Sequence, residues 1–159
     1  MRWIGLFLML GLAACQSAKR TSQGPEGLLA SSYADFKASH GEPIKSLGNL
    51  HVYAPIGMLV YTDPKEQRII GLVAGWFQGG TGFSGKLAGI ALGDTWPFCL
   101  QKLGEPSYRH SGGPDYDEAL WDFPGKRLRI EIWTQDGTDT DLGGSYLAET
   151  VKRIQWSVY

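Results

Sequence analysis

The sequence predicts an α+β fold in which two copies of one unit, a helix followed by a three-stranded antiparallel meander, pack around a shared core. Two amphipathic segments end in the same Gly-Glu-Pro sequence, at 41–43 and at 104–106. Runs rich in β-branched and aromatic residues follow each segment, and Gly and Pro separate these runs at turn positions. We therefore expect a domain over 28–159, made of repeat one at 28–75, a linker at 76–91 and repeat two at 92–159.

The first helix is expected over Leu28–His40. Ser32 and Asp35 have the spacing of a capping-box-like pair, in which side chains satisfy free amides at the start of a helix. Gly41 can take the left-handed conformation that ends a helix, and Pro43 prevents its continuation.

The second helix is expected to begin at Asp94 or Thr95 and to end at Gly104. Pro97 falls in the first turn, where backbone amides lack partners within the helix. Four residues recur at helical spacing and form one apolar stripe: Trp96, Cys99, Leu100 and Leu103. This position predicts that Cys99 is a buried, inert thiol and not a reactive one.

Six strands are expected, three in each unit, at 50–54, 57–62, 67–74, 119–123, 127–134 and 149–158. The third is apolar on both faces, which favours an interior place in a sheet. The fifth alternates: Leu128, Ile130 and Ile132 face inward, and Arg127, Arg129, Glu131 and Trp133 face outward.

The N-terminus has the features of an export signal. A short basic start is followed by an apolar run, Trp3–Leu12, that is too short to span a bilayer. The sequence Leu12-Ala13-Ala14-Cys15 resembles the lipobox of bacterial lipoproteins. An ordinary signal peptide with a chance cysteine is the alternative.

The lipobox resemblance implies that residues 1–14 form a signal peptide and that Cys15 is lipidated, which anchors the chain to a membrane. The polar segment 15–27 then serves as a flexible tether. Gln16, in the place of an Asp, favours the outer membrane by analogy with enterobacterial lipoproteins, with the domain on the periplasmic side.

A second resemblance covers Leu92 to about Trp133, with a weaker echo in Leu29–Leu72. A helix closing with Leu-Gly-Glu-Pro, then a strand with a Trp and a basic hairpin, is similar to the domain of small outer-membrane assembly lipoproteins. It is also similar to the tandem repeats of secreted β-lactamase inhibitor proteins. The resemblance implies the fold and a general role in protein binding, and it assigns no binding residues.

Composition and motifs argue against several classes of ligand. The chain has 15 basic and 16 acidic residues and no basic stripe, so nucleic acid is not an expected partner. Gly80–Lys86 matches the start of a phosphate-binding loop, but Leu87 replaces the required hydroxyl residue, so no nucleotide is expected. The three histidines lack metal-ligand spacing, and the acidic loop Asp136–Gly144 does not fit an EF-hand. We expect no cofactor and no metal.

These observations predict a non-catalytic protein-binding lipoprotein whose partner is an envelope protein or a toxin. It would act either as an accessory of envelope assembly or as an inhibitor or immunity protein. Its expected binding residues lie on the outward face of one strand, Arg129, Glu131 and Trp133, and in a loop region, Tyr108, Asp115 and Tyr116. The alternative is a cell-wall or glycan hydrolase that uses the acidic segment Asp115–Glu118.

Overall fold

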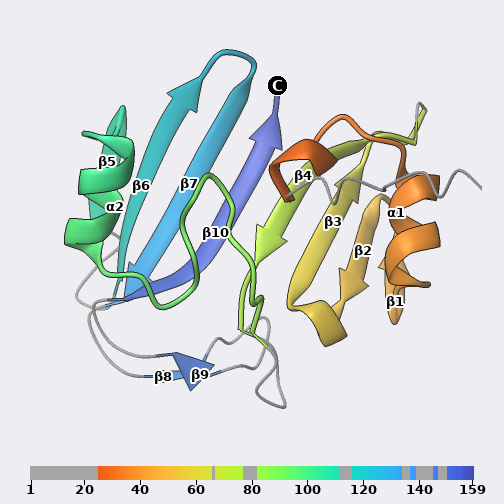
Figure 1. Ribbon diagram of the computed structural model, residues 1–159, viewed down its shortest axis with the longest axis horizontal. Helices are drawn as coiled ribbons and strands as arrows, with labels where there is room; N and C mark the ends of the chain where they lie inside the picture. Colours follow the sequence, from red (N-terminus) through yellow and green to blue (C-terminus); the bar gives the residue numbers. More distant parts are fainter. Residues whose placement is uncertain are drawn as a thin grey trace, which may run out of the picture.

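The computed structural model describes residues 25–65, 67–76, 82–111, 116–133, 137–138, 145–146 and 150–159. Two short α-helices and two 3-10 turns accompany ten strands in this part of the chain (Figure 1). The helical elements are η1 (Pro25–Leu28), α1 (Tyr33–His40), η2 (Ala54–Ile56) and α2 (Trp96–Leu103). The strands are β1 (Lys45–Leu47), β2 (Leu50–Tyr53), β3 (Met58–Thr62), β4 (Ile69–Ala74), β5 (Tyr108–Ser111), β6 (Tyr116–Phe123), β7 (Lys126–Trp133), β8 (Gly137–Thr138), β9 (Ser145–Tyr146) and β10 (Val151–Val158). None of the described helices is long and apolar enough to cross a membrane.

Eight of the strands form one antiparallel sheet in the order β1-β2-β3-β4-β10-β7-β6-β5, and β8 and β9 form a separate pair. The last strand of the chain, β10, lies between β4 and β7 and joins the earlier strands to the later ones (Figure 1). The protein is therefore mainly β.

The prediction of an α+β fold with two helix-plus-three-stranded repeats is wrong. The pairing of β10 with β4 makes one continuous sheet, and each edge carries a strand that was not expected. These edge strands, β1 and β5, are short and exposed along their whole length. An exposed edge strand buries no face, so its sequence lacks the apolar alternation that identifies a strand.

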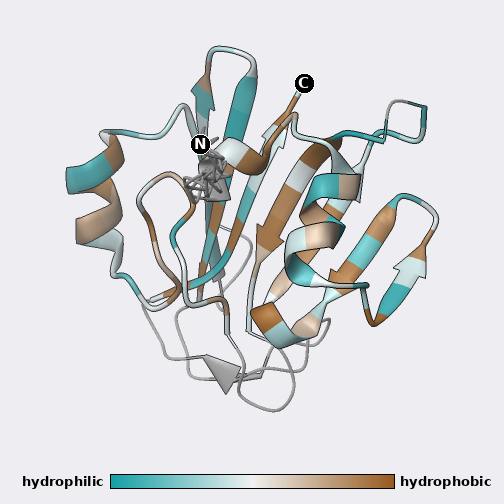
Figure 2. Cartoon of the chain, turned by 45° about the vertical axis from the view of Figure 1, so that its right-hand side comes forward, coloured by the Kyte–Doolittle hydropathy of each residue, from teal (hydrophilic) through white to brown (hydrophobic). Residues whose placement is uncertain are grey.

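One face of the sheet is covered by α1, α2 and the segment 82–95, which lie on the same side (Figure 1). Hydrophobic and hydrophilic residues alternate along the strands (Figure 2), as expected when one face packs against a core. Strands β2, β3, β4, β6, β7 and β10, both helices and the covering segment contribute to one core cluster. Its largest fully buried apolar side chains are Phe36, Val60, Ile69, Leu72, Leu87, Ile90, Leu128, Ile130, Val151 and Ile154.

The segment expected to be a flexible linker is, in its described part, a component of this core. Leu87 and Ile90 have no exposed surface and exchange two backbone hydrogen bonds, of 2.9 and 3.0 Å. Ala88 and Gly89 between them both have positive φ angles, as in the tightest two-residue turns. Residues 87–90 therefore form a tight turn whose apolar side chains are part of the core.

The first helix is shorter than expected. Pro25–Leu28 is a separate 3-10 turn, and α1 begins only at Tyr33. Between them the chain pairs with the start of β4, because Ala30 donates to the Ile69 carbonyl and Ile69 donates to the Ser31 carbonyl. Ser32 precedes α1 but makes no side-chain capping hydrogen bond, so the predicted capping box is also wrong.

The second helix agrees closely with expectation. It covers Trp96–Leu103, and Gly104 follows it with a positive φ of 77°. Cys99 has no exposed surface, which confirms that it lies on the buried stripe. Burial, and then the charge of Asp94, raise the pKa of the Cys99 thiol to about 12. The thiol is therefore inert at neutral pH.

Candidate interaction surface on the open sheet face

Register places the outward side chains of all eight strands on one continuous surface, which we call the open face. In an antiparallel sheet, directly paired residues point to the same side. The middle row of the open face is Lys45, Val52, Leu59, Val73, Gln155, Arg129, Leu120 and Tyr108. Among the described residues, both helices and the segment 82–95 lie on the opposite side of the sheet.

Two further rows flank the middle one. One contains Leu47, Leu50, Tyr61, Gly71, Ser157, Arg127 and Asp122. The other contains Arg153, Glu131, Glu118 and His110. The open face is thus largely apolar over β1–β4 and largely charged over β10, β7 and β6. The border between the two halves follows the β4–β10 pair.

Four side chains form a charge cluster on the charged half: Glu118, Arg129, Glu131 and Arg153. Glu118 and Glu131 are directly opposite each other on β6 and β7, an arrangement that repels. Arg129 relieves the repulsion, because its Nη2 donates to Glu118 Oε2 and lies 3.2 Å from Glu131 Oε1. Arg153 Nη1 lies 3.7 Å from the other oxygen of Glu131.

The guanidinium groups shield the carboxylates of the charge cluster from solvent. The side chains of Glu118 and Glu131 are 14% and 10% exposed, whereas that of Arg129 is 38% exposed. A molecule that approaches this half of the open face therefore meets mainly Arg129, with the carboxylates beneath it.

A hollow of about 260 Å³ lies where the apolar and charged halves meet. Leu59, Tyr61 and Val73 form its apolar side, and Tyr61 also packs beside Gly71, where a Cβ would lie 3.5 Å from the Tyr61 side chain. The polar side is formed by Arg129, Glu131, Arg153 and Gln155. We call this feature the hollow below.

The structure brings together several of the residues expected to bind a partner. Arg129 and Glu131 line the hollow, as members of the outward face that the alternation of β7 predicts. Tyr108 lies on the same open face, on the edge strand β5, with its ring 6.4 Å from that of His110. The backbones of Trp133 and Tyr116 pair at the end of β7 and β6. Asp115 and Cys15 lie outside the described residues.

The remaining lining residues of the hollow were not expected as binding residues. Leu59, Tyr61 and Val73 belong to strands that the sequence predicts, but their position beside Arg129 depends on the β4–β10 pairing. That pairing joins residues far apart in the chain, and no local pattern specifies it. Only the polar side of the hollow has a sequence signal: Arg153 and Gln155 alternate with apolar residues along β10, which predicts that both face outward.

The acidic segment proposed for a hydrolase is divided by the sheet. Asp117 faces the side of the helices and pairs with Arg109 at 2.7 Å, while Glu118 faces the open side and pairs with Arg129. Arg109 also lies over the ring of Trp96, at 4.8 Å. Asp117 and Glu118 thus do not share a site, and within the described chain no group of three His, Cys, Asp or Glu residues could hold a metal ion.

A second polar cluster lies beneath α1. Ser46 Oγ is 2.9 Å from His51 Nδ1, His51 Nε2 is 3.2 Å from Thr62 Oγ1, and Thr62 donates to the Asn49 carbonyl. Because that carbonyl can only accept, these contacts are all satisfied when His51 is neutral with its proton on Nε2. Tyr33 stacks on the imidazole at 4.2 Å. Burial, and then the charge of Lys37, lower the pKa of His51.

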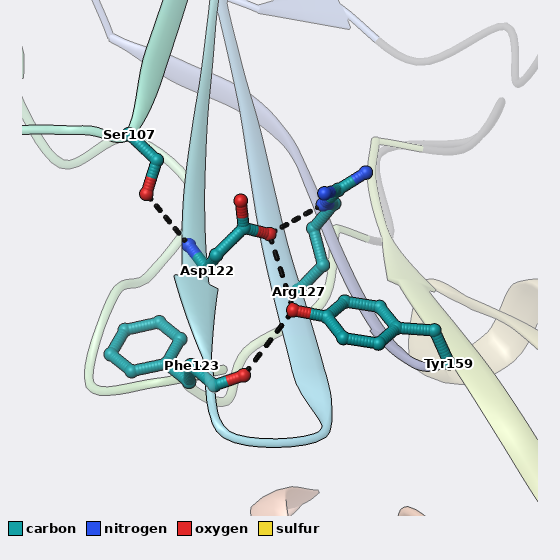
Figure 3. Close-up of polar contacts among 5 residues, drawn as sticks. All are labelled: Ser107, Asp122, Phe123, Arg127 and Tyr159. Atoms are coloured by element: carbon teal, nitrogen blue, oxygen red, sulfur yellow. Dashed lines mark hydrogen bonds and ion pairs between the residues drawn. The ribbon is translucent and has the colours of Figure 1, made fainter.

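The end of the β6–β7 hairpin is held by Tyr159. Its hydroxyl lies 3.4 Å from Asp122 Oδ1 and 3.3 Å from the Phe123 carbonyl oxygen (Figure 3). Arg127 donates to Asp122 at 2.6 Å and lies over the Tyr159 ring. The bond from Arg127 lowers the pKa of Asp122. Ser107, the residue before β5, accepts a hydrogen bond from the Asp122 amide and so connects the start of β5 to this hairpin (Figure 3).

Comparison with known proteins identifies similar folds and no family. No protein-family model matches the chain, and no curated protein matches its sequence. A crystal structure of a DUF4309 family protein (YjgB) from Bacillus subtilis matches with a TM-score of 0.50 and 19% identity, over 81% of this chain and 79% of that one.

Two longer proteins also contain a similar fold. An extracellular protein containing a SCP domain from Bacillus anthracis matches with a TM-score of 0.55 and 9% identity, over 90% of this chain and 48% of that one. A cysteine-rich secretory protein (SAV1118) from Staphylococcus aureus matches with a TM-score of 0.54 and 9% identity, over 86% and 47%. This chain spans about half the length of these two proteins. At such identities the likeness concerns the fold alone.

Proposed function

We propose that this protein is a non-catalytic protein-binding module of the bacterial envelope. The observation that carries the proposal is the open face, an eight-stranded surface that no described helix covers and that contains the hollow at its centre. The apolar face of a sheet is usually buried against another layer of structure. The apolar half of the open face is therefore suited to a second protein.

The size of the open face agrees with this role. Eight strands at about 4.8 Å spacing extend over roughly 34 Å, and three rows of side chains about 7 Å apart extend over roughly 14 Å in the other direction. A standard protein–protein interface uses about 800 Å² of each partner. One partner can thus contact both the apolar half and the charge cluster.

We also propose the cellular location that the N-terminal sequence predicts. Lipidation of Cys15 would hold the domain at the periplasmic face of the outer membrane, through the tether 15–27. The partner is then an envelope protein or a toxin. Such a surface is compatible with envelope assembly and with inhibition or immunity, and the identity of the captured partner distinguishes them.

Capture from membranes with matched variants tests the role of the open face. Leu59→Glu places a charge on the apolar side of the hollow. Phe98→Glu is the matched control, because Phe98 is a surface residue of α2, on the other side of the sheet. After chemical cross-linking and mass spectrometry, we expect one protein to be retained by the wild type and by Phe98→Glu and to be lost from Leu59→Glu.

Two results would contradict the proposal. If no protein is enriched with the wild type over a mock sample, the protein is not a stable binding module. If Phe98→Glu loses the partner and Leu59→Glu retains it, binding uses the helix side. Circular dichroism and thermal melting of both variants establish that each is folded.

The lipid anchor has a separate test. Cells that express the wild type should incorporate radioactive palmitate into the protein, and Cys15→Ser should abolish both the label and membrane retention. Labelling that persists in Cys15→Ser would refute lipidation at this residue and leave the open-face proposal unaffected.

A further inference from the structure

We infer that the hollow is an anchor site for one aromatic side chain, a Tyr or Trp, from the partner protein. This inference rests on the proposed function, since it names the chemistry by which a partner would engage the open face. It follows from the two unlike sides of the hollow, from their charge and from their size.

The sides of the hollow suit the two surfaces of an aromatic ring. Leu59 and Val73 offer aliphatic carbon, and Tyr61 adds an aromatic surface. Arg129 lines the other side, one strand beyond Gln155 in the same row as Val73. A guanidinium plane stacks on the electron-rich face of Trp or Tyr, and the ring edge packs well against aliphatic groups. Gln155 adds an amide that can pair with a phenol hydroxyl or an indole N–H.

The charge balance of the cluster favours a neutral occupant. Two guanidinium groups and two carboxylates are already paired around the hollow. The four charges of the cluster sum to zero, and an added carboxylate or ammonium group would meet repulsion from one sign of charge together with attraction from the other, so neither charge gains a clear net attraction. An aromatic side chain gains the cation–π contact without disturbing the pairs, because a paired guanidinium keeps its free face.

Arg129 is held ready for such a contact before any partner arrives. Its Nη2 contacts both Glu118 and Glu131, which favours one position of the guanidinium group. Its Nε is buried and, among the described residues, has no hydrogen-bond partner, so the side chain is enclosed along its stem. Ordering a long side chain is a main cost of association. Because Arg129 is already ordered in the folded protein, little further conformational entropy is lost when a partner binds.

The volume of the hollow, about 260 Å³, also fits an anchor. Pockets for small-molecule ligands usually measure about 300–1,000 Å³, so the hollow has a size suited to one side chain, and Tyr and Trp are among the side chains that dominate the energetics of protein interfaces. The hollow lies at the centre of the sheet, on β3, β4, β10 and β7, where a partner on the open face would exclude water around it.

Titration with a small probe tests the inference by NMR. N-acetyl-L-tyrosinamide is added to methyl-labelled protein, and the methyl signals of Leu59 and Val73 should move upfield through the ring current and saturate. N-acetyl-L-leucinamide is the apolar control, 4-hydroxyphenylacetate the anionic control and tyramine the cationic control. We expect tyrosinamide to bind more tightly than all three.

Arg129→Lys keeps the charge and removes the plane, so it should weaken tyrosinamide binding roughly two- to five-fold. Arg127→Lys is the matched control on the same open face, outside the hollow, and should leave binding unchanged. Thermal melting of both variants separates a loss of binding from a loss of fold.

The outcomes are distinct. Equal binding of leucinamide, tighter binding of either charged probe, or absence of saturable shifts at Leu59 and Val73 would each overturn the aromatic anchor. If the probe fails while Leu59→Glu still abolishes capture of a protein, the open face remains the binding surface. If the probe binds but no protein is ever captured, the proposed function fails.

Discussion

At the scale of the residue, His51 shows how burial selects one form of an imidazole. The folded protein lowers the pKa of His51 below its ordinary 6.5, mainly through burial. The folded protein therefore favours the neutral imidazole of His51. The stabilisation that results is fully present above pH 6.5. The stabilisation is lost as the pH falls below 6.5 toward the lower pKa of the folded state.

We accordingly expect the melting temperature to decrease between pH 7.5 and 5.0, and the decrease to be smaller in His51→Gln. Gln keeps two polar atoms for Ser46 and Thr62 but does not titrate. Thermal melts at four pH values in one ionic strength measure the effect. An identical pH slope in the variant would show that other groups cause it.

Gly57 illustrates a position where both conformation and space require glycine. Its φ is +66°, and a Cβ there would overlap the backbone of Gly82 and Phe83. Gly48 is the matched control, with φ of +61° and nothing within 4 Å of a Cβ. We expect Gly48→Ala to cost about 1 kcal/mol, from conformation alone, and Gly57→Ala about 3 kcal/mol. Urea denaturation of both variants measures the difference, and equal costs would show that segment 82–83 moves away freely.

At the scale of the element, α2 is fixed to the sheet by the stripe that includes Cys99. Because Cys99 is fully buried and its thiol pKa is raised to about 12, the native protein should not react with Ellman's reagent at pH 8. In Cys15→Ser, one thiol should react only after urea unfolds the protein. Rapid reaction of the native form would mean that α2 opens readily.

The elements that the sequence predicts correctly are those with a strong local pattern. Leu128 and Ile130 face the core as their alternation in β7 indicates, and β4 is interior as its two apolar faces indicate. The same alternation places Arg129 and Glu131 on the outward face, where they line the hollow. These cases share one physical basis, which is burial of one face at a period of two residues.

The elements that the sequence does not reveal lack such a pattern or depend on distant pairing. All three residues of β1 and all four of β5 are exposed, so burial does not select their side chains. The glycines around Gly89 predict a linker, because Gly is frequent in loops, whereas the turn at Gly89 lies between the buried Leu87 and Ile90. Val73 joins the hollow only because β10 returns to pair with β4. Register between distant strands is a tertiary property.

At the scale of the whole molecule, β10 is the strand that connects the two parts of the sheet. It pairs with β4 on one side and with β7 on the other, and Ile154 lies opposite Ala74 and Ile130. Ile154 has no exposed surface, so Ile154→Ala should cost about 3 kcal/mol. Ile44→Ala, at a side chain 64% exposed, should change stability by less than about 0.5 kcal/mol.

The position of β10 also predicts how the sheet opens. If β10 unites the strands into one cooperative unit, amide protons of β3, β4 and β7 should exchange through the same global unfolding, and those of the exposed edges β1 and β5 should exchange faster. In Ile154→Ala, protection of β3 and β7 should fall by the same factor, which hydrogen exchange followed by NMR measures. Loss of protection in β7 with wild-type protection in β3 would show two independent halves and would contradict a single sheet held by β10.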